Sequence, residues 1–215
     1  MSTACQILHE HFTALPHLTA NYEEGDIPAN GIYILYEKNE FAHGTGRIVR
    51  IGTHTGQGNL PKRLKEHLFT PNKDRSIFRK HIGRCLLNKD NDPFLADWDI
   101  SLIKRKDRLL YENRIDPKKL AETERAVTDY MQENFSFIVF EIVEKEERLA
   151  LETALIATVA QCKNCWPSSD WLGMHHPNGK IPKHGLWNVL GLNGVPLDPD
   201  EAGSLFLTPP HAADS

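Results

Sequence analysis

The sequence predicts a mixed α/β (α+β) domain, and three observations support this fold class. The segments 31–37, 47–54 and 136–143 are rich in β-branched and aromatic residues, as strands are. Apolar residues recur at helical spacing in several of the segments that surround them. The chain has 215 residues, 40% hydrophobic and 25% charged, which is ordinary for a globular domain with a buried core.

The first elements are expected to be a short helix over 6–14 and a β-hairpin formed by 31–37 and 47–54. We expect Tyr33 to lie opposite Arg50, with both side chains on one face of the sheet.

Helices are expected next, each with its own signal. Asn59 is a helix cap, and Leu60, Leu64 and Leu68 recur every fourth residue as a buried stripe. The segment 76–87 has the pattern of a basic amphipathic helix.

The second half predicts a strand over 97–103, a helix that Asp116 caps and that ends near Glu133, and a strong helix over 145–161. From Lys163 onward, the chain is rich in Gly, Pro and Trp and is expected to be irregular.

Composition argues against a membrane or secreted protein. No apolar run approaches the roughly 20 residues of a membrane span, and the N-terminus lacks the pattern of a signal peptide. Four cysteines are too few for a disulfide framework. We therefore expect a cytoplasmic protein with no membrane partner.

Positive charge is concentrated in two segments although the net charge is -4. Residues 47–90 carry eleven Lys/Arg and three Asp/Glu, and residues 104–119 carry seven and three. These segments are either solvated basic faces or a surface that binds a polyanion. The candidate nucleic-acid contacts are Lys62, Lys65, Arg75, Arg79, Lys80 and Arg84.

Glu152 is the most informative misfit, because it lies on the apolar face of the helix predicted over 145–161. A buried carboxylate needs a partner, so Glu152 is either in a structural salt bridge or part of a metal or catalytic site. Arg63 and His67, four residues apart, lie on one helical face and form a candidate phosphate site.

Five elements in this order resemble the GIY-YIG nuclease superfamily: Gly31-Ile32-Tyr33, Arg50-Ile51-Gly52, Arg63, Glu152 and Gly185-Leu186-Trp187-Asn188. The resemblance spans about residues 30–190, with 69–134 as a helical insertion. Residues 1–29 are then an N-terminal helical extension, and residues 191–215 are a C-terminal tail.

The resemblance implies a small three-stranded sheet flanked by helices, and a metal-dependent endonuclease that hydrolyses DNA with one Mg²⁺ (or Mn²⁺) per site. It implies that Tyr33 acts as general base or proton relay, assisted by His67. Glu152 would hold the metal, Arg63 the scissile phosphate, and Asn188 would orient the site. The sequence determines neither the oligomeric state nor the choice between DNA and RNA.

The second motif departs from the family pattern, because Arg50 stands where tyrosine is usual. Arg50 would lower the pKa of Tyr33, bind phosphate itself, or mark a catalytically inactive module that binds nucleic acid without cutting it. We favour the active nuclease, since Tyr33, Arg63, His67 and Glu152 are all present.

A zinc-stabilised interaction domain is a further alternative. Cys162 and Cys165 are followed by His175 and His176, but nine residues separate the two pairs, which is not a standard finger spacing. The sequence therefore favours reduced thiols over a structural zinc.

Overall fold

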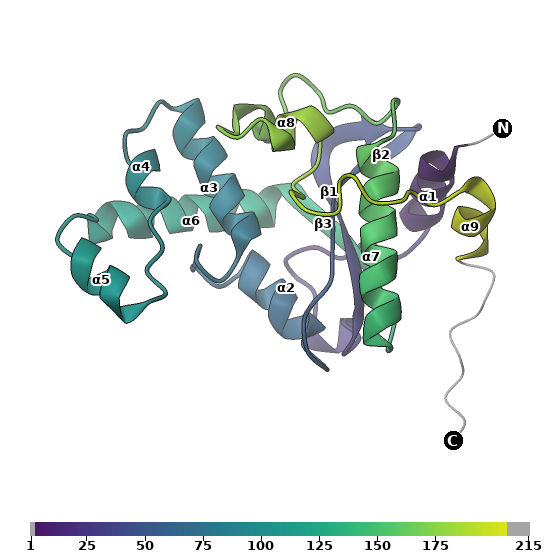
Figure 1. Ribbon diagram of the computed structural model, residues 1–215, viewed down its shortest axis with the longest axis horizontal. Coiled ribbons are helices and arrows are strands. Elements are labelled where there is room, and N and C mark those ends of the chain that lie inside the picture. The colour runs from purple at the N-terminus through teal and green to yellow at the C-terminus, as the bar shows by residue number, and fades with distance from the viewer. Residues whose placement is uncertain (1–2, 206–215) are drawn as a thin grey trace.

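A three-stranded antiparallel sheet of strand order β2-β1-β3 lies between two layers of helices in the computed structural model, which describes residues 3–205 (Figure 1). The strands are β1 (Gly31–Ala42), β2 (Thr45–Gly52) and β3 (Phe135–Glu141). The predicted mixed α/β fold, with a small sheet flanked by helices, is thereby confirmed.

The helices in chain order are α1 (Ala4–Thr13), α2 (Leu60–Leu68), α3 (Ile77–Lys89), α4 (Leu95–Trp98), α5 (Arg105–Tyr111), α6 (Pro117–Asn134), α7 (Lys145–Ala160), α8 (Lys180–His184) and α9 (Pro199–Ser204). Short 3-10 turns lie at Glu24–Asp26 and Leu172–His175. The five predicted helices all occur, within about two residues of their expected ends; α4, α5, α8 and α9 were not predicted.

Both faces of β1 are buried, because successive side chains of a strand point to opposite faces. Ile32, Ile34 and Tyr36 pack against α1 and α7, whereas Tyr33 and Leu35 belong to the core that α2, α3 and α6 complete. This arrangement accounts for the nearly continuous apolar run of β1, in place of a simple alternation.

The predicted hairpin is present, but its predicted register is wrong. Tyr33 pairs with Gly52, and Leu35 pairs with Arg50. The strands extend to a two-residue turn at 43–44, and a bulge follows Leu35. Because the pairing differs by two residues, Tyr33 and Arg50 still share one face of the sheet.

The predicted strand over 97–103 is also wrong. Its first residues form the end of α4, and the rest is irregular. Trp98 is fully buried on α3, where its Nε1 donates to the Lys80 carbonyl at 3.0 Å. A Cβ at Gly83 would lie 2.3 Å from the indole ring, so this glycine makes room for it. Packing of the tryptophan on a helix therefore outweighs the local strand preference.

The first and last described helices, α1 and α9, belong to the core on the α7 side of the sheet. α1 buries Leu8 and Phe12 against the sheet, and α9 packs on α1. The predicted tail 191–215 thus includes an ordered helix, and residues 206–215 lie outside the described part.

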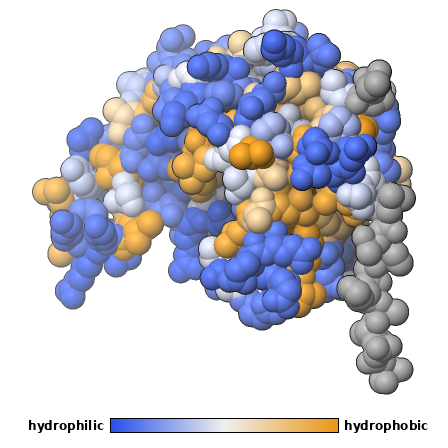
Figure 2. Space-filling view, turned by 45° about the vertical axis from the view of Figure 1, so that its right-hand side comes forward, coloured by the Kyte–Doolittle hydropathy of each residue, from blue (hydrophilic) through white to orange (hydrophobic). Residues whose placement is uncertain are grey.

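Hydrophilic residues cover most of the face shown in Figure 2, with hydrophobic patches between them, some on the lobe that α4 and α5 form. Ile103, Leu109 and Leu110 are exposed in this lobe. Within residues 3–205, no helix combines the length and the apolar character needed to cross a membrane.

Candidate active site

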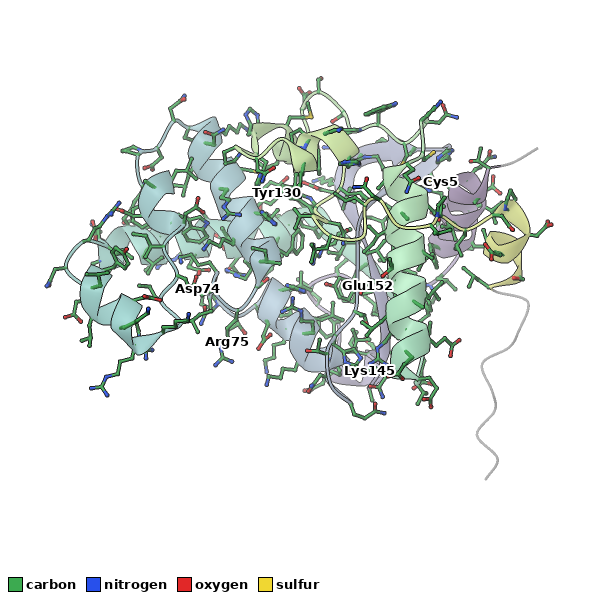
Figure 3. All side chains as sticks on the ribbon, in the orientation of Figure 1. Cys5, Asp74, Arg75, Tyr130, Lys145 and Glu152 are labelled. Carbon is green, nitrogen blue, oxygen red and sulfur yellow. The ribbon has the colours of Figure 1, made fainter. Side chains whose placement is uncertain are left out.

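The sequence-predicted site residues come from four elements and one loop: Tyr33 on β1, Arg50 on β2, Arg63 and His67 on α2, Glu152 on α7, and Asn188 in the segment after α8. Figure 3 places Glu152 on the side of α7 that faces α2. Hydrogen bonds and charge interactions link these residues into one cluster.

Tyr33 and His67 are in direct contact. The Tyr33 Oη lies 2.9 Å from the His67 Nε2, and both side chains are buried. On its other side, the His67 Nδ1 lies 2.6 Å from the Ser76 Oγ. Ser76 is the N-cap of α3, and its hydroxyl also accepts the Arg79 N–H. The two helices that flank the sheet thus fix the imidazole against the tyrosine.

His67 is held in its neutral form. Burial lowers its pKa well below the usual 6.5, and the positive charges of Arg63, Arg50 and Arg79 lower it further. A neutral imidazole has one ring nitrogen that accepts a hydrogen bond. At neutral pH, His67 therefore has a ring nitrogen that can accept a hydrogen bond.

Gly52 places Tyr33. A Cβ at this position would lie 2.3 Å from the Tyr33 Oη and 2.4 Å from the ring carbon that bears it. Only glycine leaves room for the phenol to lie flat on β2, which gives the last residue of the Arg50-Ile51-Gly52 motif a steric role.

Gly52→Ala should displace Tyr33 and reduce any activity that depends on it by about 100-fold, because a shift near 1 Å costs that much in a positioned site. The measurement is the rate of nucleic-acid cleavage beside the melting temperature. Gly25→Ala is the matched control, since a Cβ there meets no atom within 4 Å. Equal rates in the two variants would contradict this role of Gly52.

Glu152 forms a hydrogen bond with Thr53, the residue that follows Gly52. Its Oε1 accepts the backbone N–H of Thr53 at 3.0 Å. Burial raises the pKa of Glu152 above its usual 4.5, while the charges of Arg50 and Arg63 and the hydrogen bond from Thr53 oppose this rise. Within residues 3–205, no cation lies within 4.0 Å of the carboxylate, so the structural salt bridge, one of the two alternatives for Glu152, is not formed.

The donor set at Glu152 fits a divalent cation. Only one carboxylate oxygen is engaged by a protein donor among the described residues, which leaves a hard oxygen ligand. Mg²⁺ typically binds through one or two carboxylates and keeps several waters or phosphate oxygens. Glu152 is thus able to hold such an ion while Thr53 fixes its orientation.

Arg63 lies on the rim of a hollow of about 310 Å³. The lining residues are Thr53, His54, Thr55, Asn59, Lys62, Arg63 and Glu66. The Arg63 Nη1 donates to the Arg75 carbonyl at 3.1 Å, and its side chain is 27% exposed. Since Thr53 also contacts Glu152, the hollow adjoins the carboxylate, and a bound anion would meet a cation there.

Arg50 is buried, with its Nη1 donating to the Trp187 carbonyl at 3.0 Å and its guanidinium 4.8 Å from the centre of the Phe78 ring. Its Nε has no hydrogen-bond partner within residues 3–205. The positive charge acts on both His67 and Glu152. Arg50 therefore contributes an electrostatic field and an anchor for the C-terminal segment.

Asn188 fixes the backbone of β2. Its Oδ1 accepts the Ile51 N–H at 3.0 Å, and its Nδ2 donates to the Ile51 carbonyl at 2.8 Å. The adjacent Trp187 donates its Nε1 to Glu37 at 2.8 Å. Asn188 thus acts on the site through the motif strand.

Part of the predicted nucleic-acid surface is corrected by the packing. Arg79 is fully buried and paired with Glu124 at 2.9 Å, so it is a structural residue. Lys80 donates to the Asp99 carbonyl, and Arg84 pairs with the Asp99 carboxylate at 2.6 Å. Lys62, Lys65 and Arg75 are exposed. The basic helix α3 therefore uses much of its charge inside the molecule.

His175 and His176, which the sequence offered as zinc-ligand candidates beside Cys162 and Cys165, have other partners. The His176 Nε2 lies 2.9 Å from the Nδ1 of His81 on α3, and the Asn88 side chain binds the His175 carbonyl. These histidines join the C-terminal segment to α3 and do not approach the cysteine pair.

Sequence reasoning missed Thr53 and Ser76. Thr53 contributes a backbone N–H, which has no sequence signal of its own. Ser76 was placed at the start of a helix, and an N-cap hydroxyl is a donor or acceptor that a neighbouring helix can use.

Comparisons with known proteins agree with this geometry. The family model of the GIY-YIG domain matches residues 3–201. A search of curated proteins found no match, and neither did a search of solved structures. The matched range includes α1 and part of α9, and is wider than the predicted domain of 30–190.

Proposed function

Because the chain belongs to the GIY-YIG domain family, which indicates nuclease activity, we propose that it is a divalent-metal-dependent endonuclease that hydrolyses phosphodiester bonds in DNA. The observation that carries this proposal is the contact of 2.9 Å between Tyr33 and His67, with Glu152 held by the residue after Gly52. A proton acceptor, a metal-ligating carboxylate and an arginine are thus gathered at the end of one hairpin.

Tyr33 and His67 serve as the proton relay. In the tautomer that carries hydrogen on Nδ1, His67 donates to the Ser76 Oγ and presents the lone pair of Nε2 to the Tyr33 hydroxyl. Tyrosine alone is a poor base at neutral pH, because its usual pKa is about 10. As the Tyr33 oxygen accepts a proton from the attacking water, its own hydroxyl proton moves toward the His67 Nε2, so that no free phenolate has to form first.

Glu152 holds the metal, and Arg63 binds the scissile phosphate from the adjoining hollow. When bound, Mg²⁺ (or Mn²⁺) polarises the phosphate and offsets the charge that grows in the transition state. Arg63 adds a fixed cation to the same phosphate. Arg50 and Asn188 position the site, through charge and through the backbone of β2.

Lys62 lines this hollow. Together with Lys65 and Arg75, which are also exposed, it is a proposed contact with the nucleic-acid backbone. Residues 69–134 are proposed as an insertion into a nuclease domain of residues 30–190. A cytoplasmic location is part of the same proposal.

The proposal is tested by incubating the purified protein with supercoiled plasmid, single-stranded DNA and RNA, each with Mg²⁺, Mn²⁺ or EDTA. Nicking of the plasmid that EDTA abolishes is the expected result, with Glu152→Gln in parallel to detect a contaminating nuclease. Binding without cleavage, in any metal, would replace the enzyme by the inactive nucleic-acid-binding module. Cleavage of RNA alone would change the substrate class.

The pH dependence of cleavage should follow Glu152 and not His67. Protonated Glu152 does not bind metal, and its raised pKa puts the acidic loss of activity above pH 4.5. His67, whose pKa lies well below 6.5, stays neutral and adds no inflection near pH 6.5.

The measurement is a pH–rate profile at two Mg²⁺ concentrations that differ about tenfold. Since Glu152 binds either a proton or the metal, the acidic limb should move by up to about one pH unit toward lower pH at the higher concentration. An acidic limb that is independent of Mg²⁺ would contradict the role of Glu152 as ligand.

A further inference from the structure

A second cluster of metal-binding side chains lies at the end of the molecule where α7 terminates. It joins Cys5 and His9 of α1, His43 of the β1–β2 turn, and Cys162 and Cys165 after α7. In Figure 3, Cys5 lies toward the end of α7 that is opposite to Lys145. The chain places these residues in three separate segments, so their meeting is a product of the fold.

The donor atoms of this cluster lie close together. The ligand atoms of Cys5, His9, His43 and Cys165 all lie within 4.8 Å of one another. The Cys162 Sγ lies 3.5 Å from the His43 Nε2, so Cys162 adjoins this group of ligand atoms. Around tetrahedral Zn²⁺, sulfur and nitrogen ligands are separated by roughly 3.5–3.8 Å.

The local backbone is suited to present these donors. Cys162 and Cys165 have the two-residue spacing of zinc-binding cysteine pairs. His43 has a φ of 53°, in the left-handed region. Two-residue hairpin turns require this conformation, and histidine is among the residues that adopt it most readily.

Unlike the other residues of the cluster, His9 has both ring nitrogens in contact with backbone groups. Its Nδ1 lies 2.8 Å from the Cys5 carbonyl, and its Nε2 accepts the Ile48 N–H at 3.2 Å. The lone pair that a metal would need is thus already in use. His9 lies 3.6 Å from the Cys165 sulfur, where it supports the ligands from behind.

We propose that Cys5, His43, Cys162 and Cys165 bind one structural Zn²⁺ ion. Binding would release the thiol protons to solvent, and the tetrahedral site would be closed by four protein ligands. The ion would tie α1 and the hairpin turn to the end of α7. Glu152 lies ten residues before Cys162, about 15 Å along a helix, so this ion would be separate from the catalytic metal.

The test is metal analysis of the full chain, purified under reducing conditions without chelator. About one zinc per chain is expected, together with a lower melting temperature after chelation, by on the order of 10 °C or more. Cobalt in place of zinc should give the visible absorption of a tetrahedral, thiolate-rich site. Protein that holds no zinc, and takes up none from a Zn²⁺ solution, would overturn the proposal.

The zinc content of single-residue variants identifies the ligands of the ion. Cys162→Ala and His43→Ala should lose the zinc, whereas Cys85→Ala, a buried cysteine in the other core, should retain it. Where a variant fails to fold, chelation of the wild type still gives the answer. Retention of zinc by Glu152→Gln is expected, and its loss there would place the ion in the active site. Loss in His9→Ala with retention in Cys162→Ala would overturn the ligand assignment.

Discussion

Glu152→Gln should reduce cleavage of supercoiled plasmid by about 1,000-fold or more, to the limit of detection. The amide is nearly the same size as the carboxylate and can still accept the Thr53 N–H. It lacks the negative charge that a hard divalent cation requires. Because burial opposes the charged form of Glu152, the neutral amide should leave the protein as stable as the wild type, or more stable.

The measurement combines single-turnover nicking with thermal unfolding. Glu147→Gln is the matched control, since Glu147 is an exposed carboxylate on the same helix. It should cleave at the wild-type rate. A Glu152→Gln protein that retains more than about a tenth of the activity would place the catalytic metal on other ligands.

Arg63→Ala should lower the single-turnover rate by about 1,000-fold, because a guanidinium that contacts the transferring phosphate stabilises charge in the transition state. Lys62→Ala is the comparison, as Lys62 is an exposed cation on the same helix and lines the same hollow. It should weaken binding to all sequences and reduce the salt dependence by about one ion, with little change in the maximal rate.

Arg63→Ala and Lys62→Ala should both fold. Arg63 makes one backbone contact and a partly exposed ion pair with Glu66 at 3.7 Å, and such pairs contribute little to stability. Lys62 is exposed. Arg63→Lys tests the geometry, because lysine keeps the charge without the planar fork. Equal losses of rate in Arg63→Ala and Lys62→Ala would assign Arg63 to backbone binding alone.

Sequence reasoning was most successful where the signal is local. The stripe of Leu60, Leu64 and Leu68 correctly predicted α2, and the Asp116 side chain caps α6 as expected. The prediction over 97–103 failed because Trp98 packs on a helix. Asn59 is the N-cap residue of α2 as predicted, but its side chain donates to the Thr55 carbonyl and makes no capping hydrogen bond.

The count of charged residues in a segment also failed where tertiary packing decides the outcome. Arg47 counts as a basic residue in the sequence, but it is fully buried and paired with Glu40 at 2.6 Å. Arg79 is neutralised by Glu124, which lies 45 residues away in the chain. A sum over a segment cannot separate such cations from solvent-exposed ones, because the partner is chosen by packing.

The sequence by itself determined the strands and helices of the core, the order of the motifs and the kind of chemistry they supply. These properties depend on side-chain type and on spacing over a few residues. Only the tertiary structure decided the contacts between Tyr33 and His67, between Thr53 and Glu152, and between His43 and Cys162. These pairs are 34, 99 and 119 residues apart, and their approach is fixed by the packing of two helical layers on one sheet.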